Sequence, residues 1–212
     1  MAATDYTQRY IYRITHRDNI PYLLANGICA RNHPQYSATY VNIGHSDVIA
    51  ARAATNVRIP DYGLMHDYVP FYYNIKSIML YNIITGYRGV TQRNQDAIVA
   101  LVAQIATVVN SGRRFFFTDG QGNARMTSHY NNTAELEKID WGLISSGNFR
   151  NDNSDPDKTR RYQAEFHVHN ELPLAHLAGI ATYNEATAEW VRQAVANQGL
   201  QILVKPKPSL YF

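Results

Sequence analysis

Hydrophobic and polar residues alternate along residues 10–15, YIYRIT, and this alternation predicts a first β-strand. Asp18 follows as a candidate N-cap for a short helix over NIPYLLAN, with Pro21 in the first turn and Gly27 as the stop. The strand and the helix should meet in a tight junction, where short polar side chains and backbone groups can contact a ligand. A second short helix is predicted from Ser46 through DVIAARAATN.

The clearest helical pattern lies in NQDAIVALVAQIATVVN, residues 94–110. Apolar residues recur there at i, i+3, i+4 and i+7 spacing, and Ser111-Gly112 ends the run, so we expect a core helix. RFFFTDGQGNA then predicts a strand that leaves into a glycine-rich turn. TAELEKIDW predicts a further helix, capped by Asn132 or Thr133.

Residues 148–161, NFRNDNSDPDKTRR, contain no periodic apolar residue and predict an exposed loop. The loop leads into YQAEFHVH, residues 162–169, where alternation places Glu165 and His167 on a polar face. The strand should therefore aim Glu165 into whatever cleft that face borders. A last helix over residues 184–198 and a closing strand, LQILV, complete the pattern.

Strands and helices mix without a regular β-α-β repeat, which favours an α+β fold with a mainly antiparallel sheet. The length of 212 residues and the hydrophobic content of 45% suit one sizeable core, so we expect a single domain over residues 1–212. DGQGNA lacks the spacing and the lysine of a Walker loop, and the sequence contains no GxGxxG. These patterns argue against a Rossmann or P-loop enzyme.

The most unusual segment is HDYVPFYYNIKSIMLY, residues 66–81, which gathers aromatic rings without helical or strand periodicity. Pro70 fixes its own φ and favours an extended residue before it, so Tyr68, Phe71 and Tyr72 should project from a stiff ribbon. Rings held in this way can stack on a base or a nicotinamide. Aromatic-rich segments are also common in half-buried strands, and the sequence leaves both interpretations open.

Composition narrows the class of partner and the compartment. The 16 tyrosines, against 2 tryptophans and 7 phenylalanines, suit surfaces that meet polar planar ligands. A formal net charge of +3 permits contact with a polyanion without the strong basic bias of a dedicated nucleic-acid-binding protein. Cys29 is the single cysteine, which excludes an internal disulfide and a zinc site built on several cysteines.

Two further features bear on localisation. The N-terminal segment, MAATDYTQRYIYRITHRDN, lacks the apolar core of a secretory signal. The longest apolar run, AIVALVAQIATVV, is too short to span a bilayer. We therefore expect a soluble protein without a membrane partner, located in the reducing cytoplasm.

Three charged residues are candidates for chemistry. Glu165, on a strand beside a basic loop, could stabilise a cationic transition state of glycosidic-bond cleavage, or it could be an ordinary solvent-facing residue. Arg52 could bind a phosphate or a carboxylate, or it could lie on a solvated helix face. Arg13 lies within a mostly apolar strand and needs an anion or a cleft unless that strand is an edge.

The histidines give little support for a metal site. They show no HExxH pattern, and the HxH at residues 167–169 is a weak metal signal by itself. Isolated histidines more often form ordinary hydrogen bonds. We therefore expect no metal.

Four segments together resemble the DarT family of DNA ADP-ribosyltransferase toxins, whose members are paired with a macrodomain antitoxin. They are YRITHRDNI at residues 12–20, the helix that carries Arg52, HDYVPFYYNIKSIMLY at residues 66–81, and QAEFHVHNELPL from residue 163. The match follows the same order over nearly the whole chain.

The resemblance implies an ADP-ribosyltransferase-like fold, whose central sheet is split around an NAD cleft with flanking helices. It also implies that NAD+ is the co-substrate, that the nicotinamide–ribose bond is cleaved, and that ADP-ribose passes to a base of single-stranded DNA. Glu165 matches the family's catalytic glutamate and Arg52 its active-site arginine. The residues implied to bind NAD+ are Arg13, Thr15, His16, Asn19, Tyr68, Phe71, Tyr72 and Met79. Those implied to bind DNA, on the loop before Glu165, are Arg150, Lys158, Arg160 and Arg161.

Charge then gives an expected mechanism. As nicotinamide leaves, C1′ of the ribose gains oxocarbenium character, and Glu165 would hydrogen-bond the 2′-hydroxyl of that ribose. Arg52 would hold phosphates or assist removal of the proton from the attacking base. Thymine is the expected acceptor and guanine the next. Transfer to RNA or protein, and a non-catalytic module whose tyrosines stack bases, remain as alternatives.

Overall fold

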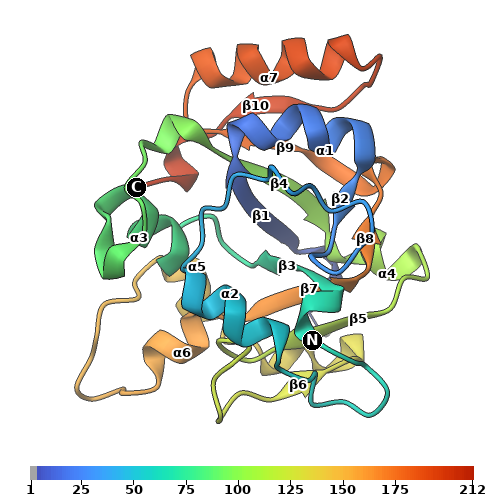
Figure 1. Cartoon of the computed structure of the whole chain (residues 1–212). Coiled ribbons are helices and arrows are strands. Elements are labelled where there is room, and N and C mark those ends of the chain that lie inside the picture. The colour runs from blue at the N-terminus through green and yellow to red at the C-terminus, as the bar shows by residue number, and fades with distance from the viewer. Residues whose placement is uncertain (1–3) are drawn as a thin grey trace.

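A single eight-stranded sheet organises the chain, with its strands in the order β10-β9-β4-β1-β3-β7-β5-β6 (Figure 1). The computed structural model describes residues 4–212, so the first three residues of the expected domain lie outside the described part. The strands of this sheet are β1 (Tyr10–His16), β3 (Tyr68–Tyr72), β4 (Ile98–Gln104), β5 (Phe115–Thr118), β6 (His129–Tyr130), β7 (Glu165–His169), β9 (Leu177–Thr182) and β10 (Val204–Pro206).

Neighbouring strands of this sheet run antiparallel except β9 and β10, which are parallel. A second, two-stranded ladder pairs β2 (Ile28–Cys29) with β8 (Glu171–Leu172). The predicted α+β class with a mainly antiparallel sheet is confirmed.

Short helices surround the sheet (Figure 1). The α-helices are α1 (Ile20–Asn26), α2 (Ser46–Ala53), α3 (Ile78–Thr85), α4 (Ile105–Asn110), α5 (Trp141–Ser146), α6 (Lys158–Tyr162) and α7 (Glu185–Asn197). The 3₁₀ segments are Tyr6–Gln8, Arg17–Asn19, Met65–Asp67, Tyr87–Gly89, Gln95–Ala97, Thr133–Lys138, Leu174–His176 and Pro208–Leu210. Within residues 4–212, no helix is both long and apolar enough to cross a membrane.

The centre of the sheet is buried on both faces, as β4 shows. Val99 and Leu101 pack in the larger apolar cluster, which also contains residues of α1 and α7. Ile98 and Ala100 point the other way, into a second cluster with residues of α3. All four side chains are at most 1% exposed. This strand therefore has an apolar residue at nearly every position.

The predicted core helix over residues 94–110 is wrong for most of its length, because residues 98–104 form β4 and the α-helix covers only residues 105–110. A strand buried on both faces shows a continuous apolar run without alternation, and such a run also matches helical spacing. The packing of helices on both faces of the sheet decides between the two structures, and a local pattern does not contain that information.

Other boundaries differ locally. Asp18 is not the cap of α1: the ring of His16 caps the preceding 3₁₀ turn by accepting the N–H of Asp18 at 3.3 Å. The predicted helix after Asn132 is a 3₁₀ segment, capped by Asn132, and α5 begins separately. The strand predicted from residue 162 begins at residue 165, because α6 occupies the end of the predicted loop. The closing strand begins only at residue 204.

The sheet nearly separates between β1 and β3. These two strands share one register pair, Tyr12 opposite Tyr72, whereas β1 and β4 pair along the whole of β1. The aromatic ribbon supplies β3, which is paired with β7 on its other side, and then the start of α3. The expected division of the sheet around a cleft is therefore found at the β1–β3 border.

Candidate active site

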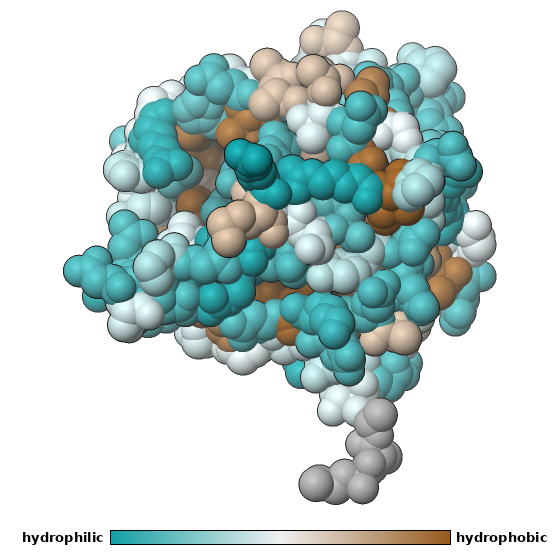
Figure 2. All heavy atoms as spheres, turned by 90° about the horizontal axis from the view of Figure 1, so that it is seen from below, coloured by the Kyte–Doolittle hydropathy of each residue, from teal (hydrophilic) through white to brown (hydrophobic). Residues whose placement is uncertain are grey.

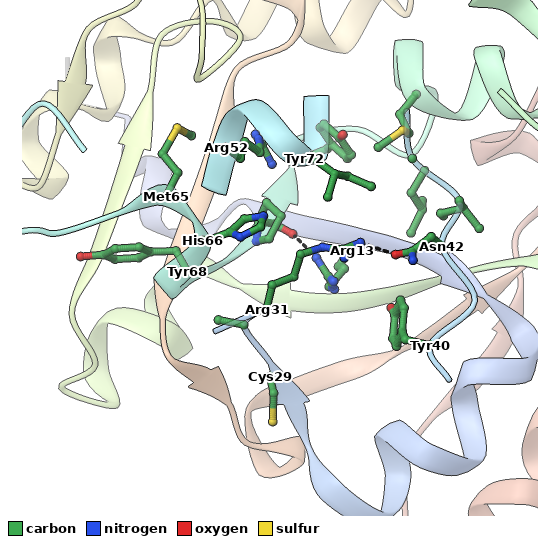
Figure 3. A pocket seen from close by; sticks show the side chains of 17 residues that line it. Arg13, Cys29, Arg31, Tyr40, Asn42, Arg52, Met65, His66, Tyr68 and Tyr72 are labelled. Atoms are coloured by element: carbon green, nitrogen blue, oxygen red, sulfur yellow. Dashed lines mark hydrogen bonds between the residues drawn. The ribbon is translucent and has the colours of Figure 1, made fainter. Parts of the chain in front are cut away.

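A pocket opens where β1 and β3 diverge (Figure 3). Three arginines line it, Arg13 from β1, Arg31 from the segment after β2, and Arg52 from α2. Among the residues that the structure describes, no carboxylate lines this pocket. Arg13 and Arg31 have no acidic partner among residues 4–212, so their charges favour an anionic ligand with several phosphate or carboxylate oxygens.

Two of these arginines are held by neighbours that leave donors free. Arg13 donates from Nη1 to the carbonyl oxygen of Pro70 at 3.2 Å, and its buried Nε has no partner among residues 4–212. Arg31 donates to Oδ1 of Asn42 (Figure 3). It also lies 5.3 Å from the ring centroid of Tyr36. Since a guanidinium has five N–H donors, each side chain retains donors for a ligand.

Arg52 joins the pocket to a buried ionic cluster. It donates from Nη2 to Oε2 of Glu165, and Nε2 of His167 lies 3.0 Å from the same oxygen. The side chains of Arg52, Glu165 and His167 are 15%, 5% and 1% exposed. We call these three residues the Glu165 cluster. Glu165 and His167 share one face of β7, as the alternation predicted, but Glu165 is buried beyond Arg52 and does not itself line the pocket.

The charge state of the Glu165 cluster follows from burial and contacts. Burial alone would raise the pKa of Glu165, but the guanidinium of Arg52 and the hydrogen bond from His167 hold that pKa below its ordinary value. Burial lowers the pKa of His167 despite the neighbouring carboxylate. Glu165 is therefore ionised at neutral pH, and His167 is a neutral ring whose Nε2–H donates to it.

Residues 119–128, which connect β5 to β6, lie against this cluster, and we call them the covering loop. A Cβ atom at Gly122 would lie 3.0 Å from Oε2 of Glu165 and 2.6 Å from Cε of Met65. Only a glycine lets the backbone approach the carboxylate so closely. DGQGNA is thus part of the site, although it is no phosphate-binding loop of the Walker type.

The structure divides the residues that the resemblance assigns to NAD+ into two groups. Tyr68, Tyr72 and Met79 line the pocket with Arg13. Phe71 does not: it is completely buried in the larger core cluster, because it points to the opposite side of β3.

Thr15 and Asn19 lie outside the lining and support it from behind. Oγ1 of Thr15 is 2.6 Å from the hydroxyl of Tyr40, which lines the pocket. The amide of Asn19 donates to the carbonyl oxygen of Val41 at 3.0 Å and accepts its N–H at 2.8 Å. His16 is also outside the lining and lies 3.5 Å from Arg93. Direct contact of these three residues with NAD+ stays a prediction.

Sequence reasoning missed several residues of the pocket wall. Arg31, Tyr40 and Asn42 come from the segment between β2 and α2, which contains no periodic pattern. The signal that the sequence offered was an arginine two residues after a short apolar stretch, Ile28–Cys29. His66 and Met65 come from the turn before β3.

The basic residues assigned to DNA differ from one another. Arg160 pairs with Asp157 at 2.7 Å and Asp119 at 2.9 Å, and Arg161 binds Asp155 at 2.7 Å. The loop is therefore less open than expected, because these arginines hold its end together. Lys158 is 3.8 Å from an aspartate, Asp152, whereas Arg150 is exposed and has no ion pair within the described part of the chain.

One group of possible metal ligands is brought together, although no metal site was expected. Cys29, His33 and Glu171 each offer one possible ligand atom, and these three atoms lie within 4.8 Å of one another. Nδ1 of His33 accepts the N–H of Gln35 at 3.2 Å, and Glu171 pairs with Arg113 at 2.8 Å. These groups already have protein partners, so the cluster does not by itself indicate a metal.

Comparison with known proteins identifies the family. The family model described as "ssDNA thymidine ADP-ribosyltransferase, DarT" matches residues 12–212. A DNA ADP-ribosyl transferase of Escherichia coli O127:H6 is 36% identical over 202 residues, which are 95% of this chain and 93% of the relative. Thermus sp. 2.9 DarT in complex with ADP-ribosylated ssDNA superposes on this chain with a TM-score of 0.90 at 29% sequence identity. Thermus sp. 2.9 DarT in complex with NAD+ superposes with a TM-score of 0.85 at 28% identity. Both matches cover 100% of each chain. The chain therefore belongs to the DarT family of single-stranded DNA ADP-ribosyltransferases.

Proposed function

We propose that this chain binds NAD+ in the three-arginine pocket and transfers ADP-ribose to thymine in single-stranded DNA, with Glu165 as the catalytic residue. The observation that carries the proposal is the combination of a cationic pocket and one ionised, buried carboxylate joined to it by Arg52. Family membership and the complexes of Thermus DarT with NAD+ and with ADP-ribosylated DNA support the choice of both substrates.

The pocket residues hold the dinucleotide. Arg13 and Arg31 have free N–H donors that suit the pyrophosphate, whose charge they would neutralise. Tyr72 and Met79 wall the pocket near the β1–β3 border, where a flat ring can pack against them. NAD+ is the co-substrate in this proposal and is consumed in each turnover.

Glu165 acts on the sugar carbon at which the bond breaks. As the bond from C1′ to the nicotinamide nitrogen opens, the departing ring takes the electron pair and the ribose acquires positive charge. The carboxylate of Glu165 hydrogen-bonds the 2′-hydroxyl and places negative charge next to this centre. A base nitrogen then bonds to C1′ and releases its proton to solvent water, and Arg52 compensates the negative charge that develops on the base.

The DNA contact is proposed on the side that carries the covering loop and α6. Figure 2 shows the face seen from below as mostly hydrophilic, with hydrophobic residues in small separate patches. In Figure 1, β6 and α6 lie toward this side. Such a face suits a charged and hydrated strand. Arg125 of the covering loop and Arg150 are exposed cations on this side, and neither has an ion pair among residues 4–212. A single strand is the easier substrate because no base pair has to be opened.

The experiment combines the protein, NAD+ and single-stranded oligonucleotides that differ only in one base, followed by mass measurement. We expect an ADP-ribose adduct on the thymine-containing strand. Glu165→Ala should abolish it, whereas Glu137→Ala, at an exposed glutamate, should not. An adduct on guanine, RNA or protein would show that thymine is not the acceptor or not the only one. Oligonucleotide binding without any adduct would indicate the non-catalytic module.

We also propose a biological role as the toxin of a toxin–antitoxin pair, acting in the cytoplasm. Family membership supports this role and implies a macrodomain antitoxin that opposes the modification. Induced expression should stop growth of a host cell, and Glu165→Ala should relieve the arrest. Growth arrest by both forms at equal protein level would contradict this role.

A further inference from the structure

The buried imidazole of His167 has no role in the function proposed above. Its side chain is 1% exposed, and its Nε2 lies 3.0 Å from Oε2 of Glu165. Its Nδ1 is buried and has no hydrogen-bond partner among residues 4–212. A buried ring with one unpaired nitrogen costs free energy that an apolar side chain in the same place would avoid. What a histidine provides here, beyond packing, is therefore its one hydrogen bond, from Nε2 to Oε2 of Glu165.

The ring of His167 is held in a fixed orientation. It stacks on Phe116 with a centroid distance of 4.2 Å and an interplanar angle of 3°. Phe116 stacks in turn on His129, at 5.3 Å and 13°. In the sheet, His167 is opposite Phe116 of β5 and Pro70 of β3. A ring enclosed in this way keeps Nε2 directed at the carboxylate.

The two oxygens of Glu165 have different surroundings. Oε2 accepts from Arg52 and from His167. Oε1 accepts no hydrogen bond from any residue in the described part of the chain, and it is not among the fully buried polar atoms. We propose that His167 is a positioning residue: together with Arg52 it fixes Oε2, so that Oε1 is the oxygen that meets the ribose of NAD+. This inference rests on the catalytic role proposed for Glu165.

The charges around the ring give this contact a measurable effect. The titratable and charged groups that face His167 are Glu165 on its own strand, Arg52 of α2, and His129 of β6 beyond Phe116. His167 donates as a neutral ring, since burial lowers its pKa. Because the donor stabilises the ionised carboxylate, its removal raises the pKa of Glu165 and shifts the acid limb of the rate profile to higher pH.

The test compares His167→Leu, His167→Gln and a matched His176→Leu control, with kcat and KM for NAD+ measured across pH at saturating oligonucleotide. His167→Leu should lower kcat about 10- to 100-fold, the usual effect of losing an orienting contact, with KM within about threefold. The acid limb should move to higher pH. His167→Gln should restore most of the turnover, because its amide reaches the position of Nε2. The control should behave as wild type.

Unchanged kcat and an unmoved acid limb in His167→Leu would overturn the proposal. So would a loss of turnover that glutamine does not restore, since that result indicates packing alone. If the leucine variant does not fold, His167→Asn takes its place. The amide of asparagine reaches the position of Nδ1 and not that of Nε2, so His167→Gln should retain activity and His167→Asn should not. Wild-type transfer by Glu165→Ala would instead refute the function on which this inference rests.

Discussion

Arg160 provides the sharpest test of how the loop before β7 works, because two roles predict opposite results. Its Nε and Nη2 bind both oxygens of Asp157 at 2.7 and 2.8 Å, and its Nη1 donates to Asp119 at 2.9 Å and to Thr127 at 3.1 Å. Its carbonyl oxygen accepts the N–H of Gln121 at 3.0 Å. Arg160 therefore fastens the covering loop to α6, and four of its five N–H donors are occupied before any DNA arrives.

The magnitude of the Arg160→Ala effect follows from these contacts. The side chain is 16% exposed, and its removal leaves Asp119, at 21% exposure, without its ion-pair partner, whereas Asp157, at 34% exposure, keeps only the more distant Arg161 at 3.7 Å. A hydrogen bond to a charged group contributes about 1.5–3 kcal/mol to the free energy of unfolding. Because the Arg160 contacts are partly exposed, we expect a loss of about 2 kcal/mol for all of them together. In a protein of this size that loss lowers the melting temperature by about 4–8 °C. Transfer should also slow, because the covering loop loses its anchor above Glu165.

The assay measures thermal unfolding, transfer rate and oligonucleotide affinity at several salt concentrations, with Arg150→Ala as the matched variant. Arg150 is exposed and has no ion pair within residues 4–212, so its removal should change stability by less than about 0.5 kcal/mol. If Arg150 contacts one phosphate, the slope of log affinity against log salt should fall by about 0.7. Arg160→Ala should leave that slope unchanged.

The reverse pattern refutes the reasoning. An Arg160→Ala protein that melts with wild type and loses about 0.7 in salt slope would make Arg160 a phosphate contact. The assignment of Arg160 to DNA binding, made from the sequence, would then be correct. The ion pairs with Asp157 and Asp119 would contribute nothing measurable to stability.

Three further predictions concern the pocket wall, the covering loop and pH. Asn19→Ala should cost about 1–3 kcal/mol of stability and raise KM for NAD+ more than it lowers kcat, because its amide holds Val41; an unchanged KM would contradict this. Gly122→Ala should slow transfer while oligonucleotide affinity stays the same, since the new Cβ would crowd Glu165; wild-type turnover would show that the loop yields freely. Burial lowers the pKa of His129 from 6.5 to about 4. As the pH falls, the unfolded chain therefore protonates His129 before the folded protein does. The stability that the protein has above pH 6.5 is for this reason lost as the pH falls toward 4. Thermal melts across that range should show a steeper decline for wild type than for His129→Gln.

Local patterns predicted the elements whose signals are local. The alternation of residues 10–15 found β1, and the segment from Ser46 found α2. The last helix was found nearly to its ends, because an amphipathic helix with one buried face shows its period directly. The same reasoning failed for β4, where burial on two faces removes the alternation that marks a strand.

The candidate site was predicted to a similar, limited extent. The resemblance to DarT pointed to Glu165 and Arg52, and the fold brings them into contact across 113 positions of sequence. Their burial was not predicted, because alternation gives the face of a residue without saying what covers it. The ion pair between Arg160 and Asp119 and the pocket position of Arg31 depend on partners farther away in the sequence, which a local pattern does not reveal.

The arrangement of charge explains why Glu165 is buried when an exposed carboxylate would cost less to fold. Replacing a buried ion pair by apolar residues is often neutral or stabilising, so the pair of Glu165 and Arg52 is poorly explained by stability alone. Near a pocket of three arginines, an exposed carboxylate would turn toward whichever cation is nearest. Burial with two donors on Oε2 prevents this and leaves one oxygen oriented before the substrate arrives. In the proposed mechanism, a charge fixed in this way needs no reorganisation when the ribose becomes positive, and electrostatic catalysis depends on that property.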